Sequence, residues 1–329
     1  MSKADTLKAI TELLKQDSDK QEIKEQLIKT VIDYTNDGGI LLVPVHEDKE
    51  GTLPVLFTDA EGRPYLQAYT DKDEYMESEE HADGVKTVEM SVDALTKHVL
   101  LRSDLYGLYL NLYGDAGSFS RLDLWRVLED NESLPADSQF RNQMIERAIT
   151  FALEVHGGQV RKGSYDPFIT HPLEVLSILN SMNLISVDPN IVIAGILHDV
   201  VEDTPVEIYE IAWYFGHDVA MLVESHTEDK TKDWQQRKEQ DIADLREANI
   251  RTKSLVMADL LANLRSMCRD YMQIHEELWN RFKAPKEKQS WYYNGMIEAL
   301  EEMADYNEAA PVYWELKERY EQLFSGSQD

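Results

Sequence analysis

The segment AGILHDVVEDTP, residues 194–205, begins inside an apolar run and ends in a group of charged side chains. The run "IVIAGIL" that leads into it predicts a helix buried in a core. His198 and Asp199 stand side by side at the end of this run, and Glu202 and Asp203 follow one helical turn later. An imidazole or a carboxylate beside a core costs free energy unless a partner satisfies it. The segment therefore indicates a polar site at the end of a buried helix.

The helix that carries these residues has a marked end. In "TPVE", residues 204–207, Thr204 fits the N-cap position, Pro205 the first helical position and Glu207 the third, which is the pattern of a capping box. We therefore expect one helix to end at Asp203 and the next to begin directly after Thr204. The polar side chains then crowd the last turn of the first helix, where a cleft can open.

Two further segments offer ligands for a metal ion. Upstream, His171 precedes Pro172 at the start of the apolar helix "LEVLSIL", and downstream Asp259 lies inside the apolar helix "SLVMADLLANLRSM". A lone carboxylate in such a helix is costly unless it is paired or bound to a metal ion. Mixed imidazole and carboxylate ligation suits Mn, Fe, Co or Zn, and such an ion activates water. A histidine satisfied within the core is the alternative for each residue taken alone. We hypothesise one divalent ion held by His171, His198, Asp199 and Asp259.

The composition limits the classes of partner. The chain has 329 residues and a formal net charge of −29, which argues against nucleic acid as a partner because phosphate backbones attract basic surfaces. Cys268 is the single cysteine, so a reducing compartment is expected. No apolar run approaches the length of a membrane span, and the N-terminal residues lack the apolar core of a signal peptide. We therefore expect a cytoplasmic protein with no membrane partner.

The pattern of apolar and polar residues changes near residue 138. Before it, apolar strand patterns such as "GGILLVPV" and "LPVLFT" alternate with helical patterns, and after it helical periodicity dominates. The segment "NESLPADS" between the two parts reads as a linker. The sequence thus predicts a multidomain chain, with an N-terminal α+β module over residues 1–135 followed by an all-α helical bundle over residues 139–325.

Residues 140 to 268 resemble the HD-domain hydrolases of the RelA/SpoT type, especially the small stand-alone homologues of SpoT. The motifs that carry the resemblance are "ALEVHGGQVRKG", "PFITHPLEVLSIL", "AGILHDVVEDT", "YFGHDVAMLVE", "HTEDKTKDWQQRKEQ" and "SLVMADLLANLR". The resemblance implies an HD-domain helical bundle that removes the 3′-pyrophosphate of guanosine tetra- or pentaphosphate. It implies Mn²⁺ as the usual metal, with other divalent metals as alternatives, bound by the same four residues that the burial argument selects.

The resemblance also implies roles for residues around the metal. Glu202 and Asp203 would stand beside the attacking water and assist its attack on phosphorus, as a nearby carboxylate that accepts a proton can do. Arg161 and Lys162 would contact the nucleotide, and Asn263 matches the family's asparagine on the ribose and phosphate side. The basic residues of "EDKTKDWQQRKEQ" are candidates for a patch that faces the phosphates, although each alone is also typical of a solvated surface. The candidates that we single out there are Lys230 and Arg237.

Two departures from the family pattern leave the substrate open. After Asp259 the family usually has a basic residue, then Leu, then a ring, then Asn, whereas this chain has Leu260 and Ala262 in place of the basic residue and the ring. Phe168 also stands where Tyr is common. One alternative is a phosphatase for another phosphorylated nucleotide, such as NADPH. The other is a non-catalytic nucleotide sensor, against which the intact Glu202 and Asp203 argue.

The first third of the chain resembles, more weakly, the enhanced-serine-sensitivity (SseB-type) family. The shared segments are "GGILLVPV", "LPVLFTDAEGRPYLQAYT" and "DLYGLYLNLYGDAGSFS". The resemblance implies a small α+β module without established catalytic residues. We therefore expect a regulatory role for residues 1–135, with a protein as the partner.

Overall fold

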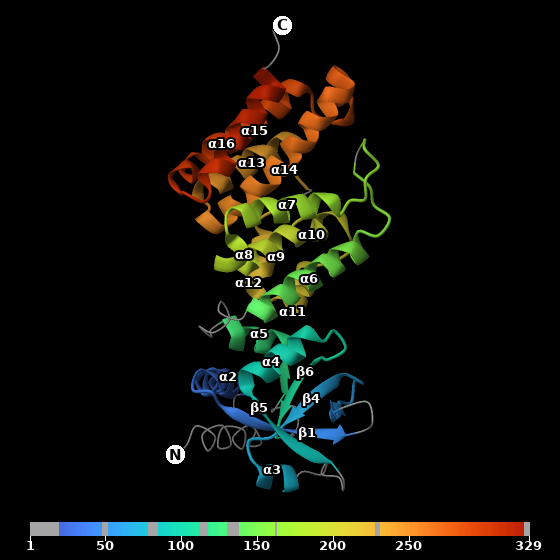
Figure 1. The fold of residues 1–329 in the computed structure, drawn as a ribbon, viewed down its shortest axis with the longest axis vertical. Coiled ribbons are helices and arrows are strands. Elements are labelled where there is room, and N and C mark those ends of the chain that lie inside the picture. The colour runs from blue at the N-terminus through green and yellow to red at the C-terminus, as the bar shows by residue number, and fades with distance from the viewer. Residues whose placement is uncertain are drawn as a thin grey trace. The chain divides into compact units, whose positions relative to one another are not determined.

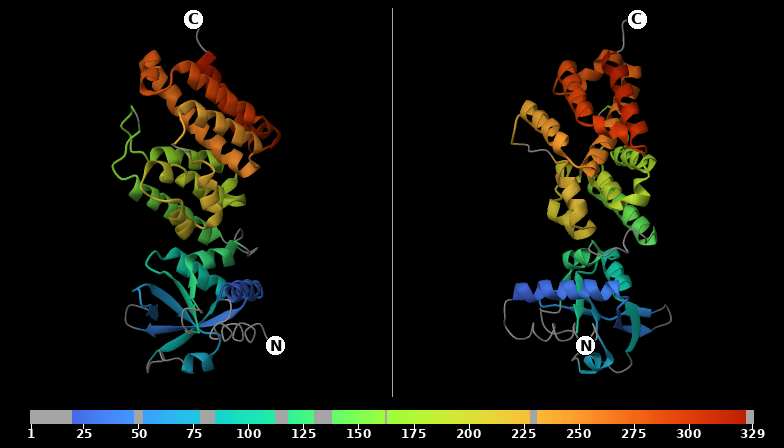
Figure 2. Two further views of the ribbon diagram at one scale, coloured as in Figure 1. Left: turned by 180° about the vertical axis from the view of Figure 1, so that it is seen from behind. Right: turned by 90° about the vertical axis from the view of Figure 1, so that its left-hand side faces the viewer.

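The computed structural model describes residues 20–47, 52–77, 85–111, 118–129, 138–161, 163–227 and 231–325. The chain divides into two compact units, the first made of residues up to Gln143 together with Ala212–His217, and the second made of the rest. Within the described ranges, strands belong to the first unit and the second unit is helical, as Figures 1 and 2 show. The predicted order of an α+β part and a helical part is thus confirmed, while the limits 1–135 and 139–325 stay a prediction.

The part of the first unit that the structure describes contains two small sheets. One is antiparallel with the order β2-β1-β5, and the other has the order β3-β4-β6-β7, in which β4 and β6 run parallel. An isolated bridge between Leu42 and Tyr69 connects them. The strands are β1 (Ile40–Glu47), β2 (Thr52–Pro54), β3 (Leu56–Thr58), β4 (Pro64–Ala68), β5 (Lys86–Ser91), β6 (Gly107–Leu110) and β7 (Ser118–Ser120). In β1, Leu41, Val43 and Val45 are buried, so the period-two pattern of a strand faces the core.

The described residues of the first unit also form four helices, of which α4 and α5 pack against strands. They are α2 (Lys20–Asn36), α3 (Lys72–Glu77), α4 (Val92–Leu101) and α5 (Arg121–Glu129). α4 begins where the Ser91 hydroxyl accepts a hydrogen bond from the amide of Ala94, as expected of an N-cap. At its other end the fully buried guanidinium of Arg121 donates to backbone carbonyls, among them those of Val99 and Arg102 at 2.9 and 2.7 Å. Arg121 therefore satisfies carbonyls that the end of a helix leaves without partners, and its charge suits that end.

The second unit is built from helices. Residues 212–217, which span parts of α11 and α12, belong to the first unit. The elements from residue 138 onward are α6 (Ser138–Val155), α7 (Thr170–Ser181), α8 (Leu184–Val187), α9 (Pro189–Leu197), α10 (Val200–Asp203), α11 (Ile208–Phe215), α12 (His217–Glu224), α13 (Trp234–Glu247), α14 (Ile250–Ile274), η3 (His275–Arg281), α15 (Lys286–Ala299), η4 (Glu301–Asp305), α16 (Ala310–Tyr320) and η5 (Glu321–Ser325). The long helix α14 packs against α7, α9 and α16. None of the helices within the described ranges has both the length and the hydropathy that a transmembrane span requires.

The close approach of α7 and α9 depends on Gly195. A Cβ atom there would lie 2.4 Å from a methyl carbon of Leu179 on α7, which is shorter than any ordinary contact. Every residue of α9 from Ile191 to Leu197 is buried, as the apolar run predicts. Because α7 carries His171 and α9 leads into His198, the packing of these two helices sets the distance between the two imidazoles.

The helix boundary after the apolar run differs from the prediction. α9 ends at Leu197, a turn at His198 and Asp199 follows, and α10 is a separate short helix. The imidazole Nδ1 of His198 lies 2.8 Å from the carbonyl of Gly195, which a continuing α-helix would pair with the amide of Asp199. The capping box is also wrong: Thr204 ends α10 by donating to the carbonyl of Val200 at 2.7 Å, and α11 begins only at Ile208.

Replacing Arg121 by Met should destabilise the first unit. The substitution keeps an apolar stem but leaves buried carbonyls without donors, which we expect to lower the free energy of unfolding by about 3 kcal/mol. Urea unfolding followed by circular dichroism measures the loss. Arg126→Gln on the same helix is the control, because Arg126 and Glu25 form an ion pair that is exposed to solvent and therefore contributes little to stability. Equal losses in the two variants would contradict the role given to Arg121.

Candidate metal centre

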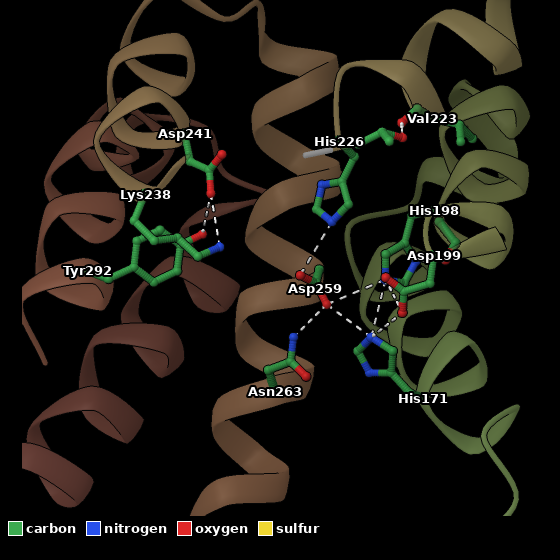
Figure 3. A network of polar contacts seen from close by, with 12 residues as sticks. His171, His198, Asp199, Val223, His226, Lys238, Asp241, Asp259, Asn263 and Tyr292 are labelled. Carbon is green, nitrogen blue, oxygen red and sulfur yellow. Dashed lines mark hydrogen bonds and ion pairs between the residues drawn. The ribbon is translucent and has the colours of Figure 1, made fainter. Parts of the chain in front are cut away.

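Three helical segments bring four side chains together. His171 is the second residue of α7, His198 and Asp199 form the turn after α9, and Asp259 lies in the middle of α14. Figure 3 shows Asp259 pointing from α14 toward the other three. Both histidines are buried, with 4% and 1% of their surfaces exposed. The structure thus places side by side the four residues that the sequence singled out as metal ligands.

The donor atoms of these side chains converge on one point. His171 Nε2 lies 3.0 Å from Asp259 Oδ1 and 3.2 Å from His198 Nε2. Asp199 Oδ2 lies 3.1 Å from His198 Nε2 and 3.6 Å from His171 Nε2. Two ligands about 2.1 Å from one ion and at right angles to each other lie about 3 Å apart. The spacing of the donor atoms therefore fits a shared divalent cation.

The tautomer of the neutral His198 ring is set by the backbone. Its Nδ1 donates to the carbonyl of Gly195 at 2.8 Å, so in the neutral ring the Nε2 lone pair faces the cluster. That lone pair meets the Nε2 of His171 and the carboxylate oxygens of two aspartates. Such a set of acceptor atoms repels itself unless a proton or a cation lies between its members. The donor set therefore fits a metal ion of the kind that imidazole and carboxylate groups bind.

The electrostatics of the cluster keep its carboxylates ionised. Burial alone would raise the pKa of Asp199, but His198 and His171 outweigh it and hold the pKa at about 2. Burial acts the same way on Asp259, and its hydrogen bonds to the histidines hold its pKa well below the usual value. Burial lowers the pKa of His198, yet Asp199 and Asp259 raise it well above the usual value. In the absence of a metal ion, a proton on His198 thus offsets part of the charge of the two carboxylates.

A chain of polar contacts leads from the cluster to Arg161. Asn263 donates from Nδ2 to Asp259 Oδ1 at 2.7 Å, and its Oδ1 accepts from Arg161 Nη2 at 3.2 Å. Asn263 lies one turn after Asp259 on the same face of α14, as the spacing predicts. The amide of Asn263 therefore fixes the Asp259 carboxylate and holds a guanidinium beside the site.

Two clefts border the cluster, and Asp199 and Asp259 line both. The Arg161 cleft has a volume of about 760 Å³, and its walls include Arg161, Asp203 and Asn263. The Lys238 cleft has a volume of about 840 Å³, and its walls include Glu202, Arg237 and Lys238. The two acids of the predicted Glu202–Asp203 pair thus line different clefts.

The position of Asp203 is fixed by a neighbouring loop. Gln159 donates from its side-chain amide to the carbonyl of Asp203 at 2.9 Å. The Gln159 oxygen in turn lies 2.9 Å from Nδ1 of the buried His156, whose ring stacks on Phe168. The loop before α7 therefore holds the backbone that carries Asp203.

The other predicted residues have different outcomes. Arg237 lines the Lys238 cleft and donates to the carbonyl of Lys232 at 2.7 Å. Lys162 and Lys230 lie outside the described residues. Sequence reasoning missed His226, whose Nε2 lies 3.5 Å from Asp259 Oδ2. The available signal was its position just after the amphipathic helix α12, since a polar residue there can turn back toward the core.

Comparison with known proteins supports the helical part of this description. A family model described as HD domain matches residues 148–286. A guanosine-3′,5′-bis(diphosphate) 3′-pyrophosphohydrolase, MESH1 of Xenopus tropicalis, is 39% identical over 127 residues, which are 38% of this chain and 70% of that protein. A GTP pyrophosphokinase of Streptomyces coelicolor is 36% identical over 148 residues, which are 44% of this chain but 17% of that protein. The chain therefore matches only a small part of the long pyrophosphokinases.

Solved structures give similar matches. The crystal structure of lmo0812 from Listeria monocytogenes is 35% identical in sequence, with a TM-score of 0.43, and the match covers 47% of this chain and 99% of that one. The structure of a metazoan ortholog of SpoT that hydrolyses ppGpp is 27% identical, with a TM-score of 0.45, and the match covers 54% of this chain and 94% of that one.

Loss of one carboxylate should abolish metal binding. At a Mn²⁺ concentration about 100 times the dissociation constant, binding adds about 2.7 kcal/mol of stability, so the Tm of the second unit should rise by about 5–10 °C. Asp259→Asn should remove this rise, as measured by differential scanning calorimetry with and without Mn²⁺. The exposed Asp305→Asn is the control and should keep it. An unchanged rise in Asp259→Asn would exclude Asp259 as a ligand.

Proposed function

Because the chain belongs to the HD-domain family that includes the 3′-pyrophosphohydrolase MESH1 of Xenopus tropicalis, we propose that it hydrolyses guanosine 3′,5′-bis(diphosphate). In this reaction water adds to the phosphorus attached to the ribose 3′-oxygen, and the bond between that oxygen and the phosphorus breaks. The products are guanosine 5′-diphosphate and pyrophosphate. The observation that carries the proposal is the convergence of His171, His198, Asp199 and Asp259 between two clefts.

These four residues would hold the metal ion. A bound divalent ion lowers the pKa of water and stabilises charge on phosphoryl oxygens. Mn²⁺ is our assignment, since imidazole and carboxylate ligands suit it, and other divalent metals are alternatives. Asn263 and the carbonyl of Gly195 hold two of the ligands in orientation, and such support tightens metal binding in proteins generally.

Glu202 and Asp203 would move the protons. A carboxylate beside the cluster can accept a proton from the attacking water, and the acid so formed can return it to the leaving 3′-oxygen. Each of the two carboxylates follows Asp199 within four residues and lines a cleft that Asp199 also lines. Both acids therefore lie close to the reacting phosphoryl group in this proposal, one in each cleft.

Basic side chains would bind the nucleotide from both clefts. Arg161 is held by Asn263 in one cleft, and Arg237 lines the other. Such guanidiniums suit phosphate and nucleobase recognition because they donate several hydrogen bonds in one plane. We assign Lys162 and Lys230 to the same task on the family resemblance alone, because both lie outside the described residues.

Two alternatives follow from Leu260 and Ala262. Leu260 lines the Lys238 cleft and both side chains are buried, so the walls near the metal differ in character from the family pattern. A phosphatase that acts on another nucleotide, such as NADPH, would use the same metal ligands. A nucleotide sensor would keep the binding residues but has no need for the acid pair.

The first unit has a regulatory role in this proposal. Among the described residues, His171, His198 and Asp259 form the one group of three such side chains that is close enough to share an ion, and it lies in the second unit. The sequence resemblance to the enhanced-serine-sensitivity family supports a protein partner for the first unit. Cys268 is a buried free thiol, and a reducing compartment such as the cytoplasm suits it.

The first test is hydrolysis of guanosine 3′,5′-bis(diphosphate) with and without Mn²⁺. We expect metal-dependent release of pyrophosphate and guanosine 5′-diphosphate, measured by anion-exchange chromatography, and no release by Asp199→Ala. Inactivity of a protein that binds Mn²⁺ would overturn the substrate and lead to NADPH and other phosphorylated nucleotides. Inactivity of a protein that binds no metal would overturn the hydrolase proposal, and binding of a protein partner by Asp199→Ala would then test the sensor.

A second test addresses the acid pair. Glu202→Gln and Asp203→Asn keep the size of each side chain but remove the proton acceptor, so each should lower kcat by about 10²- to 10⁴-fold while Mn²⁺ still raises the Tm. Steady-state kinetics and calorimetry measure the two effects. Glu207→Gln, four residues further along the chain and outside both clefts, should keep full activity. Full activity of Glu202→Gln and Asp203→Asn would assign the proton transfer to other groups.

A further inference from the structure

We propose that the ion pair of Asp270 and Arg281 selects guanine over adenine in the Arg161 cleft. The inference rests on the proposed function, because it places the base of the nucleotide at the end of the cleft away from the metal cluster. Selection of guanine by this ion pair would favour the guanosine substrate over an adenine dinucleotide such as NADPH. Neither residue was singled out by the sequence.

One face of α14 forms a wall of the Arg161 cleft. Asp259, Asn263, Met267 and Asp270 all line it, and their spacing of three or four residues keeps them on one side of the helix. At a rise of 1.5 Å per residue, Asp259 and Asp270 lie about 16 Å apart along the helix axis. A nucleotide with a diphosphate on its 3′-oxygen can bridge this span, with the phosphates at Asp259 and the base at Asp270.

Arg281 is held in a fixed orientation beside Asp270. Its Nη1 donates to Asp270 Oδ2 at 2.6 Å, and both side chains are partly exposed to the cleft. On its other side the guanidinium lies against Gly163, where a Cβ atom would be 2.0 Å from Nη1. Gly163 has a φ of +95°, which a residue with a side chain rarely adopts. Gly163 thus leaves room in its loop for the guanidinium of Arg281.

The free atoms of this pair match the hydrogen-bonding edge of guanine. Within the described residues, Arg281 is the one side chain that donates to Asp270, so Asp270 Oδ1 can accept from a ligand. Guanine presents the N1–H and N2–H donors beside the O6 acceptor, which suit a carboxylate next to a guanidinium. Adenine presents the N1 lone pair in place of the N1–H donor, so two acceptors would face each other and no hydrogen bond would form.

The walls near the pair suit a flat base. Leu278 and Phe282, three residues before and one residue after Arg281 in the chain, line the same cleft, and apolar or aromatic side chains are the surfaces on which nucleobases pack. The carboxylate and the guanidinium of the pair neutralise each other, so this end does not attract phosphates away from the metal cluster. The base therefore binds at the Asp270 end of the cleft and the phosphates bind at the Asp259 end.

The test compares two substrates that differ only in the base. These are guanosine and adenosine 3′,5′-bis(diphosphate), and the measured quantity is the ratio of their kcat/KM values. The wild type should prefer the guanine compound by about 100-fold, because a site built around hydrogen bonds leaves buried polar groups unpaired with the wrong base. Asp270→Asn should reduce this preference about tenfold or more, mainly by raising KM for the guanine compound.

A matched control lies on the same helix. Arg265 of α14 forms a comparable ion pair with Glu315, at 2.9 and 2.6 Å, and neither residue lines the Arg161 cleft. Glu315→Gln should therefore leave the ratio unchanged. Gly163→Ala displaces Arg281 without removing any charge, and it should reduce the guanine preference as Asp270→Asn does. A Mn²⁺-dependent rise in Tm shows that each variant is folded.

The outcomes separate this inference from the proposed function. If the wild type hydrolyses both compounds and Asp270→Asn keeps the wild-type ratio, the assignment of Asp270 is wrong. If the wild type hydrolyses neither, the proposed function fails, and calorimetric binding of guanosine and adenosine 5′-diphosphate still tests the selection. Tighter binding of the guanine compound that Asp270→Asn abolishes supports the inference, and equal binding of the two compounds overturns it.

Discussion

The helices of the second unit hold a group of side-chain acceptor atoms so close together that they repel one another. Two imidazole nitrogens and the carboxylates of Asp199 and Asp259 face one another at 3.0 to 3.6 Å inside a helical core. Protons or a divalent cation must lie among them, because acceptor atoms so close together are otherwise unfavourable. The packing of α7, α9 and α14 holds the donors in place, and it depends on Gly195, which has no side chain to keep α7 away.

The same constraint explains the break in the chain after α9. His198 uses the carbonyl of Gly195 to orient its ring, so the helix does not continue through Asp199. The turn that results sends the next residues along α10 between two clefts, with Glu202 toward one and Asp203 toward the other. A local hydrogen bond within the candidate metal centre thus also places Glu202 and Asp203 in different clefts beside it.

The sequence indicated the cluster because its polar residues stand in or beside apolar segments, where an unpaired polar side chain is costly. Asp259 in an apolar helix and His198 at the end of an apolar run would each cost free energy without a polar partner. The clustering of the four side chains could therefore be predicted from the sequence pattern and this cost together. The helix limits could not, because Thr204 accepts from the amide of Val206 outside any helix and so imitates a cap. Asp270 and Arg281 meet only through the turn at His275, whose φ is +47°, and a charged pair 11 residues apart carries no signal in a sequence.

Charge balance connects the metal to the nucleotide. Among its described lining residues, the Arg161 cleft has four carboxylates, Asp199, Asp203, Asp259 and Asp270, against the guanidiniums of Arg161 and Arg281. This excess of carboxylates, in a chain whose net charge is −29, opposes the entry of a polyphosphate. In the proposed function, a divalent cation at the cluster would offset this charge at the end of the cleft where the phosphates are placed. The ion that relieves the repulsion within the core would therefore also favour binding of an anionic substrate in the cleft.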